Sequence, residues 1–458
     1  MIMNSYRISD FCHFVDVGNN TTAIYNALTL GILFLNNKTA DYIKLSEGGI
    51  IDAEMGNLPD DLIDELSKRR MIFPLGERYD LDDYKRIRGL LKGTGVAILY
   101  LLLTDGCNLG CSYCYIENGL PKDYAFSQMS EDTAERALQL FIRSISPNVV
   151  EPKIVLYGGE PLLNMKTLFY VVKKVSELKE SGMLPPKTDL IINTNATLVD
   201  DAFLDFVAKY QVQISVSLDG TKEMHDLMRK QKDGRGTYDK VIANCRLMAE
   251  RKFDFGFSVT ITRANIHELE QILCQIHHEF DIKAIGFNIA LYPTEAIMGM
   301  SEMEYAQLTT EKLISCFKIC RKIGIFEDRI MRKVTAFVQG YPYIYDCGAP
   351  GDQLVITPDG MAGVCQAYIG SKENFVPMDE IKDVTKHPLW SKWRFRSPLY
   401  QKQCVSCISL GICGGGCPYN AEMKTGSIWG IDKTFCLHST ETVKFLIKDL
   451  YDQTQGAD

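Results

Sequence analysis

The hydrophobic and polar positions of this 458-residue chain change their period along its length. Between residue 96 and about residue 325, short and largely apolar runs alternate with longer segments whose apolar positions recur at helical spacing. The expected strands are residues 96–103, 154–157, 190–192, 212–218, 255–261 and 284–290. The expected helices are Ser130–Ser144, Leu168–Lys179, Asp200–Lys209, Tyr238–Arg251 and Asn265–Phe280. Repeated strand–helix units predict an α/β fold with a parallel sheet curled into a partial barrel, whose active site lies at the carboxyl ends of the strands.

Residues 1–90 show a different pattern. The short alternating stretches Val15–Val17 and Ile43–Leu45 predict strand fragments, and Pro59–Arg69 has apolar positions at helical spacing after two aspartates that suit the helix dipole. Short strands and helices within about 90 residues predict a winged-helix-like α+β domain. A winged helix could bind nucleic acid, but the ten basic and fourteen acidic residues of this segment disfavour that interpretation.

The pattern changes again beyond about residue 345. The stretch LVITPDGMAGVCQAY predicts a hairpin with Asp359-Gly360 as its turn, cysteine- and glycine-rich loops follow, and residues 439–451 predict a final amphipathic helix. We therefore expect three domains, at residues 1–90, 91–325 and 326–458.

Composition and charge narrow the class of protein. Hydrophobic residues at 46% and charged residues at 24% are typical of globular proteins. The formal charge of −8 argues against a protein that binds duplexes through phosphate contacts. The longest apolar run, residues 96–103, is far shorter than the ~20 residues of a membrane helix. Because the first 30 residues also lack a secretory signal, we expect a cytoplasmic protein with no nucleic-acid or membrane partner.

The fifteen cysteines are the unusual feature, because a reducing cytosol favours metal ligands over disulfides. Ten of them fall into two groups, and the other five are scattered. Free cysteine behaves as a small buried hydrophobe, so we expect the scattered ones in the core: Cys12, Cys245, Cys274, Cys316 and Cys320. Cys316 and Cys320 are four residues apart on an expected helix, but no other ligand pattern surrounds them.

The first group, Cys107, Cys111 and Cys114, directly follows the first expected barrel strand. Three thiolates can hold three irons of a cubane cluster and leave the fourth iron open to a substrate or cofactor. Three core cysteines, or a zinc site lacking its fourth ligand, are the alternatives.

This Cys-x3-Cys-x2-Cys pattern, with the aromatic Tyr113 before its last cysteine, resembles the signature of the radical S-adenosylmethionine (SAM) enzymes. The resemblance implies a partial (β/α)6 barrel, with Cys107, Cys111 and Cys114 as the catalytic cluster ligands. It also implies that the open iron chelates SAM and that one electron releases a 5′-deoxyadenosyl radical, which abstracts a substrate hydrogen.

Further motifs at strand ends match the same family. YGGEP at Tyr157–Pro161 resembles its GGEP motif, NTNAT at Asn193–Thr197 resembles a TNG-type strand end with Ala196 in place of glycine, and SVSLDG at Ser215–Gly220 resembles the ribose-contacting segment. The resemblance implies that Glu160 holds the methionine amino group, Ser217 the ribose and Arg229 the methionine carboxylate. The residues expected to contact SAM are Tyr113, Gly158, Gly159, Glu160, Thr194, Asn195, Ser217, Asp219 and Arg229.

The second group has seven cysteines between residue 347 and residue 436, and its spacing and CGGGCP sequence resemble the SPASM domain of radical SAM enzymes. That resemblance implies two auxiliary [4Fe–4S] clusters, and thus three clusters in all. The outer cluster would be held by Cys404, Cys407, Cys413 and Cys436, and the inner one by Cys347, Cys365 and Cys417. Two zinc sites are the alternative, although two closed tetrahedral sites need eight ligands.

The count of seven leaves one inner iron without a cysteine. Our hypothesis is that this iron binds a substrate thiolate, which then couples to a carbon radical and forms a thioether. Residues 1–90 resemble the element with which ribosomal-peptide maturases capture a leader peptide as an added strand. The partners implied are a ribosomal precursor peptide bound through its leader and a flavodoxin- or ferredoxin-type electron donor.

The leading function is therefore a maturase that forms cysteine thioethers, as sactipeptide and ranthipeptide synthases do. The alternatives are a maturase that links carbon to carbon, a sulfatase-maturating enzyme that makes formylglycine, and, from a different class, a zinc-bearing winged-helix regulator. The acceptor residue, the attacked carbon, the precursor and the oligomeric state are not encoded in these motifs.

Overall fold

The structure, a computed structural model, describes residues 5–91, 95–117, 120, 124–291, 293–369, 371 and 373–455. Its contacts group the chain into two compact units. The first comprises Met1–Lys92, Ile330–Cys347 and Arg396–Asp458, and the second comprises Gly93–Arg329 and Gly348–Phe395. The first unit thus combines segments from the two ends of the chain, and the predicted three-domain division remains a prediction.

The second unit is built on the expected parallel sheet. The six predicted strands are confirmed, and each pairs in parallel with the next. They are β7 (Ile98–Thr104), β8 (Lys153–Gly158), β9 (Asp189–Thr194), β10 (Gln213–Ser217), β11 (Phe255–Ile261) and β12 (Ala284–Ile289). Strand β7 is apolar up to its last residue, Thr104, and mostly buried, as expected for a strand covered on both faces, so its continuous apolar run identified it.

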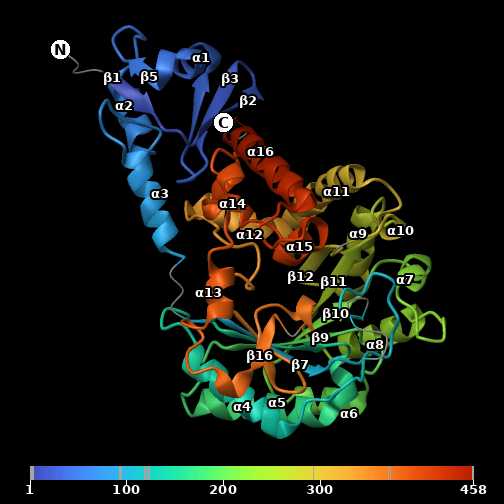
Figure 1. The fold of residues 1–458 in the computed structure, drawn as a ribbon. Helices are drawn as coiled ribbons and strands as arrows, with labels where there is room; N and C mark the ends of the chain where they lie inside the picture. Colours follow the sequence, from blue (N-terminus) through green and yellow to red (C-terminus); the bar gives the residue numbers. More distant parts are fainter. Residues whose placement is uncertain are drawn as a thin grey trace. The chain divides into compact units, whose positions relative to one another are not determined.

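The five predicted helices are confirmed as well, with small differences at their ends. They are α4 (Glu131–Ser144), α5 (Met165–Glu180), α6 (Asp201–Val207), α8 (Tyr238–Glu250) and α9 (Leu269–Phe280). Side chains at Ser130, Asn164 and Asp200 accept a backbone hydrogen bond at the starts of α4, α5 and α6, which fixes where these helices begin. Figure 1 shows α4, α5 and α6 along one side of the sheet.

Several further elements were not expected. Helix α7 (Lys222–Met228) follows β10, and α10 (Glu295–Met298) and α11 (Glu302–Ile323) follow β12. Strand β13 (Phe326–Glu327) then pairs with β12. The next elements are α12 (Asp328–Gln339) and α13 (Pro388–Arg394).

The predicted hairpin is confirmed, and it extends the barrel sheet. Strand β14 (Gln353–Ile356) pairs antiparallel with β15 (Met361–Gly363), and Gly360 in the turn has a positive φ of 81° that favours glycine. Strand β16 (Phe375–Pro377) pairs with β15 on its other side. Strand β14 also runs parallel to β7, so the ten-stranded order is β13-β12-β11-β10-β9-β8-β7-β14-β15-β16.

The first unit begins with two three-stranded sheets, of order β5-β1-β6 and β2-β3-β4. Their strands are β1 (Ser5–Ile8), β2 (Cys12–Gly18), β3 (Thr21–Asn26), β4 (Ile32–Asn36), β5 (Ile50–Asp52) and β6 (Ile72–Pro74). The helices of this part are α1 (Asn37–Leu45), α2 (Asp60–Lys68) and α3 (Tyr79–Gly89). The predicted strand Val15–Val17 lies in β2, and the predicted helix Pro59–Arg69 is α2.

The predicted strand at Ile43–Leu45 is wrong, because these residues close helix α1. The Asn36 side chain accepts a hydrogen bond from the Thr39 N–H and starts the helix, and Ala40 and Ile43 are buried at helical spacing. A three-residue stretch is too short to separate a period of two from a period of 3.6.

The other helices of the first unit come from the C-terminal part of the chain. They are most of α12, described above, and α14 (Leu410–Cys413), α15 (Pro418–Thr425) and α16 (Lys433–Gln455), the last of which extends the predicted helix 439–451 at both ends. One hydrophobic core joins both ends of the chain. Its buried members include Tyr25, Leu28 and Leu30 near the N-terminus and Leu410, Ile412, Val443 and Ile447 near the C-terminus.

Polar contacts reinforce this shared core. The Lys448 ammonium donates to the Val17 carbonyl at 2.8 Å, the Tyr84 hydroxyl donates to the Leu399 carbonyl, and the Arg88 guanidinium lies 3.8 Å from the Tyr400 ring centre. Residues 5–91 therefore complete one of their two hydrophobic cores, the one that contains Tyr25 and Leu28, only together with the C-terminal part of the chain.

The scattered cysteines mostly occupy the core, as predicted. Cys245, Cys316 and Cys320 are buried and Cys12 is half-buried, but the prediction is wrong for Cys274, which is exposed. On α9 the buried positions are Leu269, Ile272, Leu273 and Ile276. Position 274 lies off that face. Among the described residues, no helix is long and apolar enough to span a membrane.

The shared core generates a stability prediction at Gly411 in α14. An added Cβ would lie 2.5 Å from the Ala27 carbonyl oxygen, a backbone atom that cannot move aside cheaply. We expect Gly411→Ala to destabilise the first unit by about 1–3 kcal/mol. The matched control is Gly89→Ala in α3, where an added Cβ meets nothing within 4 Å and stability should be unchanged or slightly higher. Calorimetric unfolding measures both, and equal stabilities for the two variants would contradict the packing described.

Candidate active site

The three-cysteine loop follows β7 at the carboxyl edge of the parallel sheet. Cys107, Cys111 and Cys114 are half-buried thiols in no disulfide. The loop is held by backbone pairing with the segment after α7, because the Gly110 N–H donates to the Lys230 carbonyl at 2.8 Å and the Ser112 N–H donates to the Met228 carbonyl at 3.0 Å. This pairing places the segment that carries Arg229 beside the cysteines.

The glycine pair after β8 lets this loop approach the next strand. The Gly159 N–H donates to the Thr104 carbonyl at 2.9 Å and the Glu160 N–H donates to the Gly106 carbonyl at 3.0 Å. A Cβ at Gly158 would overlap the Thr104 carbonyl oxygen, and one at Gly159 would overlap that of Gly106. Side chains at these two positions would push the cysteine loop away, so glycine is required here.

Glu160 ties β8 to the end of β9. Its buried carboxylate accepts hydrogen bonds from the Thr194 hydroxyl at 2.7 Å, the Asn195 N–H at 2.7 Å and the Leu162 N–H at 3.1 Å. Burial raises the pKa of Glu160 to about 7, against the lowering effect of these donors. Both oxygens already have partners in this structure, and the expected contact with a methionine amino group remains a prediction.

Asn195 connects the β9 end to the cysteine loop. Its side-chain NH2 donates to the Asn108 Oδ1 at 2.9 Å, and the Asn108 NH2 donates to the Thr197 hydroxyl at 2.8 Å. Ala196, which replaces the glycine of the family motif, adopts a positive φ of 57° in a fully buried position. The backbone therefore takes the conformation that glycine would favour, and the Asn244 amide binds the Ala196 carbonyl at 2.7 Å.

Asp219, two residues beyond β10, is a fully buried carboxylate that joins several elements. One oxygen accepts from the Arg229 Nε at 2.9 Å and from the Tyr113 hydroxyl, and the other accepts from the Thr260 N–H at 2.9 Å. The Arg229 guanidinium also lies 5.3 Å from the Tyr113 ring centre. The structure thus brings three predicted SAM-contacting residues together, and Ser217 lies half-buried at the end of the same strand.

His225 in α7 connects the backbones of Asp219 and Arg229 through hydrogen bonds. Its Nδ1 accepts from the Asp219 N–H at 3.4 Å, and its Nε2 lies 2.9 Å from the Thr237 hydroxyl, which itself donates to the Arg229 carbonyl. Because that hydroxyl proton is used, Nε2 must carry the proton and the ring is neutral. Burial lowers the pKa of His225 to about 4.

The donor groups at the cysteine loop fit an iron–sulfur cluster. The Leu109 N–H donates to the Cys107 Sγ and the Glu117 N–H to the Cys114 Sγ, each at 3.4 Å, as backbone amides do for cluster thiolates. Burial raises the pKa of Cys107 to about 12, so a bound metal is needed to keep this thiol ionised. Within the described ranges, no three His, Cys, Asp or Glu side chains converge on the position of one ion. A cubane spreads its ligands over several irons, so the cysteines suit it better than a single zinc.

The four predicted outer-cluster ligands lie in one region of the first unit. Cys404 is close enough to Cys413, Cys407 and Cys436 for all three to raise its pKa, after the larger effect of burial. These four cysteines belong to the first unit, as do Cys347 and Cys417, whereas Cys365 belongs to the second. The inner-cluster assignment therefore remains a prediction from the sequence.

Sequence reasoning missed a tyrosine pair beside the cysteine loop. The Tyr115 and Tyr157 hydroxyls are 3.1 Å apart. Burial raises the pKa of Tyr115 well above its ordinary value, and Cys365 and Gln366 also act on its hydroxyl. Their positions, directly after Cys114 and directly before the glycine pair, were the available signal. Through Tyr115, the second unit brings Cys365 near the three-cysteine loop.

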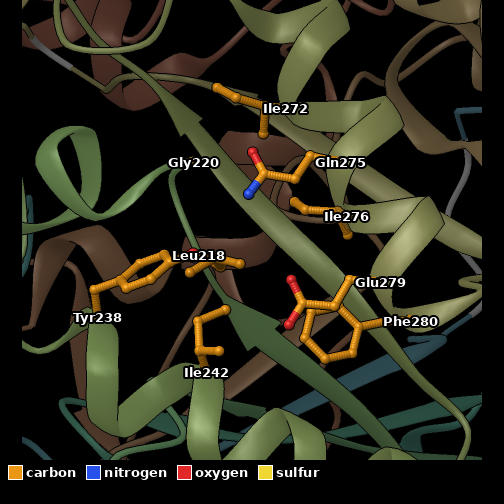
Figure 2. Close-up of a pocket in the computed structure, with 9 residues that line it drawn as sticks. All are labelled: Leu218, Gly220, Tyr238, Ile242, Ile272, Gln275, Ile276, Glu279 and Phe280. Carbon is orange, nitrogen blue, oxygen red and sulfur yellow. The ribbon is translucent and has the colours of Figure 1, made fainter.

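Two cavities are not lined by the cysteine loop. One of about 10 Å³ lies behind β10 between α8 and α9, and Figure 2 shows Tyr238 and Ile242 facing Ile272 and Ile276 across it. It can hold at most about one water molecule. The other, of about 510 Å³, is lined by residues such as Asp189 and Gln213 at the amino ends of β9 and β10. Ligands of such sheets bind at the carboxyl edge, so the larger cavity lies at the wrong end of the strands, and the smaller one has no room for a cofactor.

Comparison with known proteins identifies the family of the domain that carries this site. Residues 101–275 match the radical SAM superfamily, so the chain contains a radical SAM domain. Over 98% of its length the chain is similar, at 23% identity, to 96% of the radical SAM cyclopropyl synthase TigE of Paramaledivibacter caminithermalis. It is also 23% identical to a cysteine-type anaerobic sulfatase-maturating enzyme of Clostridium perfringens, over 72% of this chain and 91% of that protein.

Among solved structures, the fold resembles that of SuiB from Streptococcus suis, whose structures include complexes with the precursor peptide SuiA and with S-adenosylmethionine. The TM-score is 0.52 at 16% identity, over 94% of this chain and 99% of SuiB. This likeness confirms the α/β radical SAM fold predicted from the sequence.

The buried neutral His225 generates a prediction about pH. Its folded pKa of about 4 lies below the unfolded value of 6.5, so the unfolded chain binds the extra proton first as pH falls. The contribution of His225 to the free energy of unfolding is therefore fully present above pH 6.5, and up to about 3 kcal/mol of it is lost as the pH falls to 4. His225→Gln should flatten this part of the stability profile, as measured by denaturant unfolding between pH 7 and pH 4.5. An unchanged slope in the variant would contradict the neutral ring.

Proposed function

We propose that the chain is a maturase that modifies a ribosomally made precursor peptide, which residues 1–90 hold by its leader. The observation that carries this proposal is the share of the chain over which each similarity extends. The similarities to the cyclopropyl synthase and to SuiB extend over 98% and 94% of this chain, whereas the sulfatase-maturating relative leaves more than a quarter of it unmatched. SuiB has been solved with a precursor peptide, which supports the same class of substrate here.

The architecture of residues 5–91 supports peptide capture. Its two small sheets end in the edge strands β2, β4, β5 and β6. The backbone groups of an edge strand can pair with an added strand, which gives affinity without demanding one side-chain sequence. The half-buried side chains of β4 would then contact the captured peptide.

The carboxyl edge of the barrel supports the chemistry. When bound, a [4Fe–4S] cluster and S-adenosylmethionine supply a radical that takes a hydrogen atom from the substrate. Cys107, Cys111 and Cys114 would hold this cluster. Arg229, oriented by Asp219, would bind the methionine carboxylate, because its guanidinium is always charged and can bind in a bidentate way. The other predicted contacts with the cofactor are Tyr113, Gly158, Gly159, Glu160, Thr194, Asn195 and Ser217.

The auxiliary sites extend the proposal to three clusters. Cys404, Cys407, Cys413 and Cys436 would hold the outer cluster, and Cys347, Cys365 and Cys417 the inner one. A flavodoxin- or ferredoxin-type protein of a reducing cytoplasm would supply the electrons.

Two kinds of bond are candidates for the one that the enzyme forms in the precursor peptide. Seven cysteines for two clusters leave one iron free to bind a substrate thiolate, which favours a thioether. Carbon–carbon bond formation is the second candidate, because the relative that matches almost the whole chain is a cyclopropyl synthase.

The first test concerns the three-cysteine loop. Replacing Cys107, Cys111 and Cys114 by alanine should abolish reductive release of 5′-deoxyadenosine and lower the iron content from about twelve to about eight atoms per chain. The paired control is Cys316→Ala with Cys320→Ala, which removes two buried cysteines outside the site and should leave cleavage intact. Iron analysis and chromatography after anaerobic reconstitution measure both properties. Cleavage by the loop variant would refute the assignment, as would stoichiometric zinc in the parent.

A second test separates the two bonds. If a thioether forms, a precursor whose cysteines are replaced by serine should remain unlinked while S-adenosylmethionine is still cleaved. Tandem mass spectrometry of the treated precursor locates the modification. A processed product from the cysteine-free precursor would establish the carbon–carbon alternative and refute the thioether.

A further inference from the structure

Tyr25 is a buried hydrogen-bond donor that has no partner among the described residues. It lies on β3, the middle strand of the β2-β3-β4 sheet, and its side chain is 0% exposed. Within the described residues, its hydroxyl makes no hydrogen bond. Native structures rarely leave a buried hydroxyl unpaired, so an unsatisfied one indicates a partner that the protein atoms alone do not supply.

The surroundings of Tyr25 identify where that partner lies. Tyr25 shares its hydrophobic core with Leu410 and Ile412, which lie between two of the predicted outer-cluster ligands, Cys407 and Cys413. The chain between these cysteines is pressed against the end of the β3 region, because Gly411 has no room for a Cβ beside the Ala27 carbonyl. Cys407 is also near enough to raise the pKa of Tyr25 further, after the larger effect of burial.

Gln401, which precedes these cysteines in the sequence, is a second buried residue with an unpaired hydrogen-bond donor. It is 5% exposed, and its Nε2 has no hydrogen-bond partner among the described residues. Its Oε1 accepts a hydrogen bond from the Cys404 thiol at 3.3 Å. Once Cys404 binds iron it has no proton to donate, so the amide must present its NH2 to this sulfur instead. A half-turn of the amide achieves this without moving any other atom, because its oxygen and nitrogen occupy equivalent positions.

One group satisfies both donors. We infer that Tyr25 and Gln401 donate hydrogen bonds to the sulfur atoms of the outer auxiliary cluster. Through Tyr25, residues 5–91 then help to set the reduction potential of this cluster. The inference rests on the proposed function in one respect, namely that Cys404, Cys407, Cys413 and Cys436 hold this cluster. Hydrogen bonds to cluster sulfurs stabilise the reduced state, which carries more negative charge, and therefore raise the potential.

The test uses the full chain with only the outer cluster retained. In a parent carrying Cys107→Ala, Cys111→Ala, Cys114→Ala and Cys365→Ala, the remaining complete four-cysteine set is the outer one. A redox titration followed by electron paramagnetic resonance gives the midpoint potential. Proton ENDOR in H2O and D2O detects exchangeable protons near the reduced cluster.

We expect Tyr25→Phe to shift the midpoint potential to a more negative value and to remove an exchangeable proton coupling. Gln401→Met should do the same through a different proton. The matched control is Tyr451→Phe, because Tyr451 is buried in the same core and its hydroxyl lies 3.3 Å from the Thr21 hydroxyl, which serves as its partner. That control should change neither the potential nor the couplings.

The outcomes are distinguishable. A parent that binds about four irons but shows no shift and no lost coupling in either variant would overturn this inference and leave the proposed clusters in place. A shift in Tyr451→Phe equal to that in Tyr25→Phe would also overturn it, because the effect would then come from packing. A parent that binds no iron would overturn both the inference and the outer cluster on which it rests.

Discussion

The buried ion pair between Asp219 and Arg229 is the interaction on which the candidate active site depends. A carboxylate with no exposed surface is costly unless its oxygens are hydrogen-bonded, and here they bind a guanidinium, a phenol hydroxyl and a backbone N–H. Removing one member of such a buried pair typically costs about 3–5 kcal/mol. The pair therefore holds the segment after α7 in place, and that segment pairs with the cysteine loop through Gly110 and Ser112. In this way one charge pair links β10, β11 and the three cysteines.

A second constraint operates in the first unit. The segment that carries Cys407 and Cys413 shares a hydrophobic core with strand β3 and helix α16, so part of residues 5–91 and this segment depend on each other for packing. Gly411 marks the closest approach, since any side chain there would strike the Ala27 carbonyl. A module that captures a peptide and a site that holds an electron-transfer cluster would therefore share one core, which makes a physical coupling between them possible without any large movement.

The sequence was most informative where burial imposes a simple pattern. The barrel strands are continuous apolar runs and the helices between them have long amphipathic patterns, so both could be predicted. The strand predicted at Ile43–Leu45 is wrong because the cap at Asn36, and not the apolar spacing, determines that these residues are helical. The pairing of β14 with β7 and the shared core of the first unit connect residues hundreds of positions apart, which no local period encodes. At the site, the motifs named Asp219 and Arg229, but the roles of Asp219, His225 and Tyr115 emerged only from contacts across the fold.

On the proposed function, the radical SAM domain takes a hydrogen atom from a precursor peptide. The most direct measurement is isotope transfer from a precursor deuterated at its carbon-bound positions, followed by mass spectrometry of the released 5′-deoxyadenosine and of the peptide. We expect deuterium to appear in 5′-deoxyadenosine and the peptide to lose a corresponding mass. Unlabelled 5′-deoxyadenosine together with an unchanged peptide would contradict it.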